Sequence, residues 1–223
     1  MNIKLFFEAI IKIILGILII ALLLFLPANT INYWNAWLFM GLLFIPMFVA
    51  GIIMMIKSPD LLEKRLNVKE KEKEQKKVIL LSCVMFLSGF IIAGLNFRYN
   101  WLIVPNYVVI ASSIVFILSY IMYAEVLKEN KYLSRTIEVQ EGQKVVDTGL
   151  YSIVRHPMYT STIFLFLSMP LILGSLISFL IFLVYPFIIN KRIKNEEEVL
   201  EKELTGYSEY KNKVKYKMIP FIW

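Results

Sequence analysis

The only histidine of the chain, His156, lies between Arg155 and Pro157, where a polar segment gives way to a long apolar one. Arginine can hold an anion through two hydrogen bonds, and proline suits the first position of a helix. His156 would then lie at a helix N-terminus, where unpaired N–H groups and the helix dipole attract a carboxylate or phosphate. The sequence therefore indicates an anion site. An anchor in the lipid headgroup region fits the same residue types, so both interpretations stay open.

Two adjacent carboxylates, Glu196 and Glu197, follow the end of the same apolar stretch. Asn195 and Glu198 have the spacing of a capping box, which predicts that a helix begins near Asn195. If the apolar stretch folds as a hairpin, its two ends lie close together. The carboxylates would then face the histidine and the arginine across one opening. Opposite charges on two walls suit a zwitterionic cofactor.

Several common kinds of active site are excluded by what the sequence lacks. It contains no glycine-rich dinucleotide fingerprint, no P-loop and no nucleophile elbow. One histidine and one cysteine, Cys83, cannot supply the ligands of a usual zinc site, so we expect no metal. The net charge of +7 does not indicate nucleic acid, because basic residues are expected beside membrane spans.

The composition is that of an integral membrane protein, since 58% of the 223 residues are hydrophobic and the mean hydropathy is +0.66. A span needs about 20 mostly apolar residues. Four stretches meet this requirement: residues 5–26, 34–56, 78–97 and 102–127. A last apolar stretch, 158–189, is too long for one span and contains Pro170 and Gly174 near its middle, which predicts a helical hairpin. The expected fold is an all-α membrane bundle with about six crossings, or five if the stretch crosses once.

Basic residues fall on one side of these spans. Of the 24 lysines and arginines, eight lie in residues 57–77 and eight from residue 191 onward, whereas the loops 27–33 and 98–101 have almost none. If the last apolar stretch is a hairpin, the positive-inside rule places both termini, the 128–157 segment and the site in the cytoplasm.

Two further features concern the ends of the spans. Four aromatic residues fit an outer belt: Tyr33, Trp34, Trp37 and Trp101. The mixed-charge run 69–77 is predicted to be a solvated helix extension or loop without a role in chemistry.

The predicted spans divide the chain into four membrane helices, 1–127, and a region 128–223. That region would comprise a cytoplasmic segment, the hairpin 158–189 and a cytoplasmic tail, with a small cap over a cofactor.

A spaced set of motifs runs through the region 128–223. The motifs lie at 142–151, 155–159, 168–170, Phe187, 196–197, 206–210, Val214 and Pro220. Together they resemble the isoprenylcysteine carboxyl methyltransferase family, which belongs to a wider group with phospholipid methyltransferases. The N-terminal helices show no comparable resemblance.

The resemblance implies a membrane enzyme that uses S-adenosylmethionine, bound between membrane helices and a cytoplasmic cap. It implies cofactor contacts at Gln143, Val145, Val146, Tyr151, His156, Pro157, Met158, Tyr159 and Glu197. Arg192 would lie near a substrate-contacting arginine, and Arg155 and Glu196 would complete the catalytic set. Two positions depart from the family pattern. Ser161 stands where glycine is common, and Gln143 stands where histidine is common, although glutamine can still form hydrogen bonds.

The sequence thus predicts a methyltransferase whose lipophilic or lipid-modified acceptor reaches the site from the bilayer, among membrane lipids and without nucleic acid. A carboxylate acceptor needs no general base, whereas an amine would lose a proton to Glu196 or Glu197. Three alternatives stay open: an NADPH-dependent membrane reductase of the sterol-reductase type, a phospholipid N-methyltransferase, and a non-catalytic membrane scaffold. Carboxyl, amine and thiol acceptors all fit the sequence, as does any oligomeric state.

Overall fold

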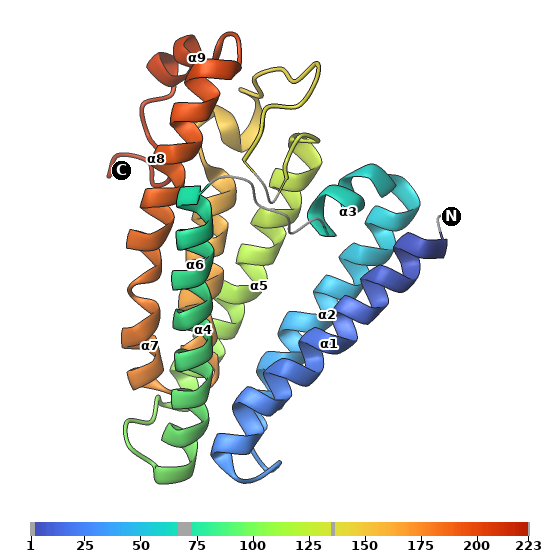
Figure 1. Cartoon of the computed structure of the whole chain (residues 1–223). Helices are drawn as coiled ribbons and strands as arrows, with labels where there is room; N and C mark the ends of the chain where they lie inside the picture. Colours follow the sequence, from blue (N-terminus) through green and yellow to red (C-terminus); the bar gives the residue numbers. More distant parts are fainter. Residues whose placement is uncertain (1–2, 67–72, 135–136, 223) are drawn as a thin grey trace.

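Every regular element in the described part of the chain is a helix, which confirms the all-α prediction (Figure 1). The computed structural model describes residues 3–66, 73–134 and 137–222. The helices are α1 (Ile3–Ala28), α2 (Trp34–Lys57), α3 (Pro59–Leu66), α4 (Lys73–Tyr99), α5 (Asn106–Glu129), α6 (Pro157–Ile172), α7 (Leu176–Phe182), α8 (Tyr185–Glu203) and α9 (Tyr207–Lys213), with a 3₁₀ turn at Gly149–Ser152.

Within the described residues, five helices are long and apolar enough to cross a membrane. Helices α1, α2, α4 and α5 correspond to the four predicted spans, and the fifth runs through α7 and α8 as Leu176–Glu203. Helix α6 has 16 residues. It is therefore about 24 Å long, shorter than a hydrocarbon core of about 30 Å. The number of crossings stays a prediction.

The membrane helices expose large apolar side chains. Phe7, Leu26, Ile45, Leu80 and Ile110 are each more than half exposed. Water-soluble monomers rarely expose apolar patches of this extent, whereas lipid tails solvate them. The exposed surface therefore supports an integral membrane protein.

The chain reverses direction in its last apolar stretch, at the break that Pro170 and Gly174 predict. Gly174 has φ = 75°, a conformation that side chains other than glycine rarely adopt. The turn is held from the start of α2, because Asn35 Nδ2 donates to the Ile172 carbonyl at 2.8 Å. Beyond the turn, the Tyr185 hydroxyl at the start of α8 donates to Thr162 Oγ1 in α6 at 3.1 Å. Helix α8 therefore returns along α6.

The aromatic-belt prediction is wrong for Tyr33. Its side chain is fully buried and stacks on Phe97, with ring centroids 4.1 Å apart. Its hydroxyl donates to the Leu173 carbonyl at 2.5 Å. Tyrosine can bury its ring when its hydroxyl finds a partner, and this turn carbonyl supplies one. Trp34 and Trp101 are about half exposed, as residues at a membrane interface would be.

The predicted helix start near Asn195 is also wrong. Helix α8 runs unbroken over Tyr185–Glu203, so Asn195 lies inside it. A proline in the first turn begins this helix, in a position where the missing N–H does no harm. Once a helix has been nucleated, its propagation is favourable, so the capping-box spacing has no helix end to cap.

One end of the bundle carries most of the irregular chain. Figure 1 shows the segment between α5 and α6 at this end, together with α9, and we call it the cavity end. The C-terminal tail pairs with the residues ahead of α6. Arg155 N donates to Tyr216 O at 3.0 Å, and His156 N donates to Lys217 O at 2.8 Å. The tail therefore fixes the backbone in which the predicted anion site lies.

Gly94 lies where α4 packs tightly against α1. A Cβ atom there would lie 2.6 Å from the Leu24 carbonyl oxygen and 3.2 Å from the Ala28 nitrogen. We expect Gly94→Ala to lower the free energy of unfolding by about 1–3 kcal/mol, because backbone atoms must move apart. Gly51→Ala is the control, since a Cβ at Gly51 meets no described atom within 4 Å. Thermal unfolding in detergent measures both variants, and a wild-type melting temperature for Gly94→Ala would contradict the tight packing.

Candidate active site

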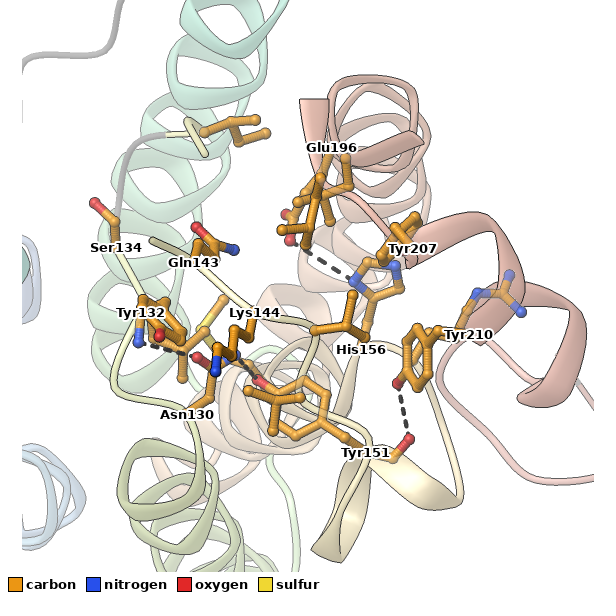
Figure 2. A pocket seen from close by; sticks show the side chains of 18 of the residues that line it. Asn130, Tyr132, Ser134, Gln143, Lys144, Tyr151, His156, Glu196, Tyr207 and Tyr210 are labelled. Atoms are coloured by element: carbon orange, nitrogen blue, oxygen red, sulfur yellow. Dashed lines mark hydrogen bonds and ion pairs between the residues drawn. The ribbon is translucent and has the colours of Figure 1, made fainter. Parts of the chain in front are cut away.

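A cavity opens at the cavity end, between the segment that precedes α6 and the helices α8 and α9 (Figure 2). Its empty volume, open mouth included, is about 840 Å³. Ten of the twelve predicted site residues line it: Gln143, Val145, Val146, Tyr151, Arg155, His156, Met158, Tyr159, Arg192 and Glu196. Pro157 and Glu197 lie outside the lining. The structure thus gathers the predicted residues, and their roles stay predictions.

His156 occupies the position immediately before α6, whose first residue is Pro157. Its ring is buried and lies between two carboxylates. Nε2 is 3.1 Å from Glu197 Oε1, and Nδ1 is 3.8 Å from Glu196 Oε1. The ring also stacks on Tyr159, with centroids 5.7 Å apart. These contacts fix the orientation of the imidazole at the edge of the cavity (Figure 2).

Arg155 and Glu197 form a buried ion pair. Arg155 Nε donates to Glu197 Oε1 at 2.8 Å, and the two side chains are 5% and 6% exposed. Arg155 Nη1 also donates to the carbonyls of Val214 and Lys215, both at 2.7 Å. The expectation that this arginine and this carboxylate face each other across an opening is wrong, because the side chains touch. The contacts of Arg155 are those of a residue that positions Glu197 and the tail.

Glu196 is the carboxylate that faces the cavity. It accepts a hydrogen bond from the Tyr159 hydroxyl, and its side chain is 22% exposed. Arg192 Nε donates to the same hydroxyl oxygen at 2.9 Å, and Arg192 Nη1 donates to Gln75 Oε1 at 3.1 Å. A chain of polar contacts thus links α4, α8 and α6 at one side of the cavity.

Gln75 is a site residue that the sequence does not predict. The mixed-charge run 69–77 is expected to be solvated, and its residues 69–72 lie outside the described residues. Gln75 lies in the first turn of α4 and is fully buried. Its contact with Arg192 joins positions 117 residues apart, which no local sequence pattern reveals.

A second polar chain supports the opposite side of the cavity. Asn130 Nδ2 donates to the Tyr151 hydroxyl at 3.1 Å, and the Tyr210 hydroxyl donates to the Tyr151 carbonyl at 2.7 Å (Figure 2). Burial raises the pKa of both tyrosines far above its usual value. Both hydroxyls are therefore neutral at physiological pH, and they hold the 3₁₀ turn against α9.

Other lining residues are absent from the sequence-based set, among them Asn130, Tyr132, Leu200, Tyr207 and Tyr210. One signal could have found Leu200, which follows Glu196 by four residues and therefore lies on the same face of α8. The two tyrosines of α9 lie in a motif of the family resemblance, but nothing in the motif shows which way their side chains point.

Comparison with known families agrees with this geometry. Residues 111–202 match the model of the isoprenylcysteine carboxyl methyltransferase family. The matched region begins in α5 and ends in α8. It contains the basic pair Arg155–His156 and the acidic pair Glu196–Glu197. A search of curated proteins found no match. The resemblance predicted from the motifs is thereby confirmed over residues 111–202, and this match, together with the five apolar helices of spanning length, supports a membrane methyltransferase.

Proposed function

We propose that the chain transfers the methyl group of S-adenosylmethionine to the carboxyl group of a lipophilic acceptor at the cytoplasmic face of the membrane. Two charged clusters, Arg155–His156 and Glu196–Glu197, meet at the cavity at the start of α6, and both lie within the residues that match the family model. This is the observation that carries the proposal. When bound, S-adenosylmethionine supplies a methyl group activated by its sulfonium. The protein's own part is to bind, to align and to exclude water.

The residues of the cavity are complementary to this cofactor. The start of α6 beside His156 suits its carboxylate, since the positive end of the helix dipole favours an anion. Glu196 suits its ammonium group or its ribose diol. Val145 and Val146 offer apolar contacts for the adenine ring, and Gln143 offers an amide. This donor set fits S-adenosylmethionine without a metal ligand.

A carboxyl acceptor is favoured over an amine by the contacts of Glu196. An amine must lose a proton before or during transfer, and Glu196 would be the base within the cavity. That carboxylate already accepts a hydrogen bond from Tyr159. A carboxylate acceptor needs no base and is attracted by Arg192, which lines the cavity three residues after the apolar part of α8 ends. A lipid-tailed acceptor would therefore present its charged end to Arg192 and leave its tail in the bilayer.

The proposed cytoplasmic location of the cavity rests on the distribution of basic residues. Helices at the cavity end carry basic residues, including Lys64 in the last turn of α3 and Lys191, Lys194 and Lys202 of α8. The positive-inside rule expects such residues in cytoplasmic segments. A cysteine placed at Lys202 in a Cys83→Ala background should react with an impermeant maleimide only after cells are opened. Reaction in intact cells would contradict this location.

Isothermal titration calorimetry of the purified protein in detergent tests the proposed cofactor. We expect binding of S-adenosylmethionine and of its product S-adenosylhomocysteine, and no binding of NADPH. Binding of NADPH without binding of either adenosyl compound would overturn the proposal and favour a membrane reductase. Absence of binding by all three would favour a scaffold.

A further inference from the structure

The hydroxyl group of Tyr207 is buried and has no hydrogen-bond partner among the described residues. Tyr207 is 4% exposed, and it lines the cavity (Figure 2). An unpaired buried hydroxyl is unfavourable, and native structures rarely contain one without a reason. A ligand in the cavity would supply the missing partner.

The backbone fixes the place of this side chain. Tyr207 begins α9 directly after Gly206, which has φ = 87°, a conformation that favours glycine. Its ring packs against Tyr210, with centroids 5.8 Å apart. The two tyrosines line the same cavity, but only the Tyr210 hydroxyl is used internally, since it donates to the Tyr151 carbonyl at 2.7 Å. The Tyr207 hydroxyl therefore remains available to a ligand, whereas the Tyr210 hydroxyl is already used.

The surroundings of the Tyr207 hydroxyl are negative. Burial raises the pKa of Tyr207, and the nearby carboxylates of Glu197 and Glu196 raise it further, whereas Arg155 lowers it. The hydroxyl is therefore neutral and lies within the field of two carboxylates. Arg155 neutralises Glu197 directly at 2.8 Å, which leaves Glu196 as the carboxylate with exposure to the cavity. A cationic group of a ligand would be most stable between Glu196 and this hydroxyl.

We propose that Tyr207 and Glu196 together bind the amino group of the methionine part of S-adenosylmethionine, with the Tyr207 hydroxyl oxygen accepting a hydrogen bond from the ammonium. The inference rests on the proposed function and names a further cofactor-binding residue, which lies outside the region matched by the family model. It also explains the unpaired hydroxyl, because the ammonium supplies the donor that the protein does not.

Tyr207→Phe tests the inference, with Tyr210→Phe as the matched control. Without ligand, Tyr207→Phe should keep or raise the melting temperature, because it removes an unpaired buried hydroxyl. Its affinity for S-adenosylhomocysteine should fall about tenfold or more, since a hydrogen bond to a charged group is lost. Tyr210→Phe should instead lower the melting temperature, because it breaks the bond to Tyr151, and should change the affinity less.

A deaminated analogue of S-adenosylhomocysteine identifies the group that Tyr207 contacts. Wild type and Tyr207→Phe should bind this analogue equally, because the analogue lacks the amino group. A deficit of Tyr207→Phe that persists with the analogue, or an unchanged affinity for S-adenosylhomocysteine, would overturn the inference. If the wild-type protein bound no adenosyl ligand, the proposed function itself would fail. If the wild type binds S-adenosylhomocysteine and Tyr207→Phe binds it equally well, only the proposed role of Tyr207 fails.

Discussion

Arg155→Met should lower the free energy of unfolding by about 3–5 kcal/mol, the typical effect of removing one partner from a buried ion pair. The change leaves the Glu197 carboxylate, whose side chain is 6% exposed, without its guanidinium. It also removes the donor that binds the carbonyls of Val214 and Lys215 at 2.7 Å. Denaturant titration of the purified protein in detergent, at fixed pH and salt, measures the loss.

Two variants make this prediction specific to the buried pair. Lys211→Ala removes a second cation 3.6 Å from Glu197 whose side chain is 33% exposed, and it should change the stability by less than about 1 kcal/mol. The double variant Arg155→Met/Glu197→Leu should recover part of the loss, because no charge is then left buried. An Arg155→Met protein as stable as wild type, or one no less stable than Lys211→Ala, would contradict the assigned role.

Glu196→Gln should weaken the binding of S-adenosylmethionine by about 10- to 100-fold, which corresponds to about 1.5–3 kcal/mol for a hydrogen bond to a charged group. The amide keeps the shape of the side chain and can still accept from the Tyr159 hydroxyl. It removes the negative charge that faces the cavity, so the cationic part of the cofactor loses its partner. Calorimetry with S-adenosylmethionine measures the affinity, and methyl transfer at saturating cofactor separates binding from rate.

Glu198→Gln is the control for this prediction. Glu198 lies in the same helix and carries the same charge, but it is exposed and does not line the cavity. Its replacement should leave the cofactor affinity at the wild-type value. If Glu196→Gln and Glu198→Gln lowered the affinity equally, the effect would come from the net charge of α8 and not from a contact in the cavity.

The parts of the fold that local backbone chemistry determines could be predicted from the sequence. Proline at the first position of α6 predicts that His156 lies at a helix start, and the structure has it there. The reversal near Gly174 follows from a residue that adopts positive φ. Apolar run length identified the four N-terminal helices. In each case the cause lies within a few residues of its effect.

The errors concern contacts between positions far apart in the chain. Tyr33 has the residue type and the position typical of a membrane interface. It is nevertheless buried, because the Leu173 carbonyl, 140 residues away, accepts a hydrogen bond from its hydroxyl. Gln75 lies among charges that favour solvent, but it accepts from Arg192 in another helix. The direct contact of Arg155 with Glu197 follows from how the residues before α6 pack against α8, and sequence spacing alone could only place them near one cavity.

The most direct test of the account is a tritium-transfer assay from methyl-labelled S-adenosylmethionine. The acceptors are prenylcysteines, aminophospholipids and lipophilic thiols, presented in detergent or vesicles, with products identified by mass. We predict a base-labile methyl ester on the carboxyl group of a lipophilic acceptor, formed by wild type and strongly reduced in Glu196→Gln. Labelled phospholipid amine or thioether in place of the ester would contradict the carboxyl assignment. A folded wild-type protein that binds S-adenosylmethionine but labels none of the three acceptor classes would contradict the account.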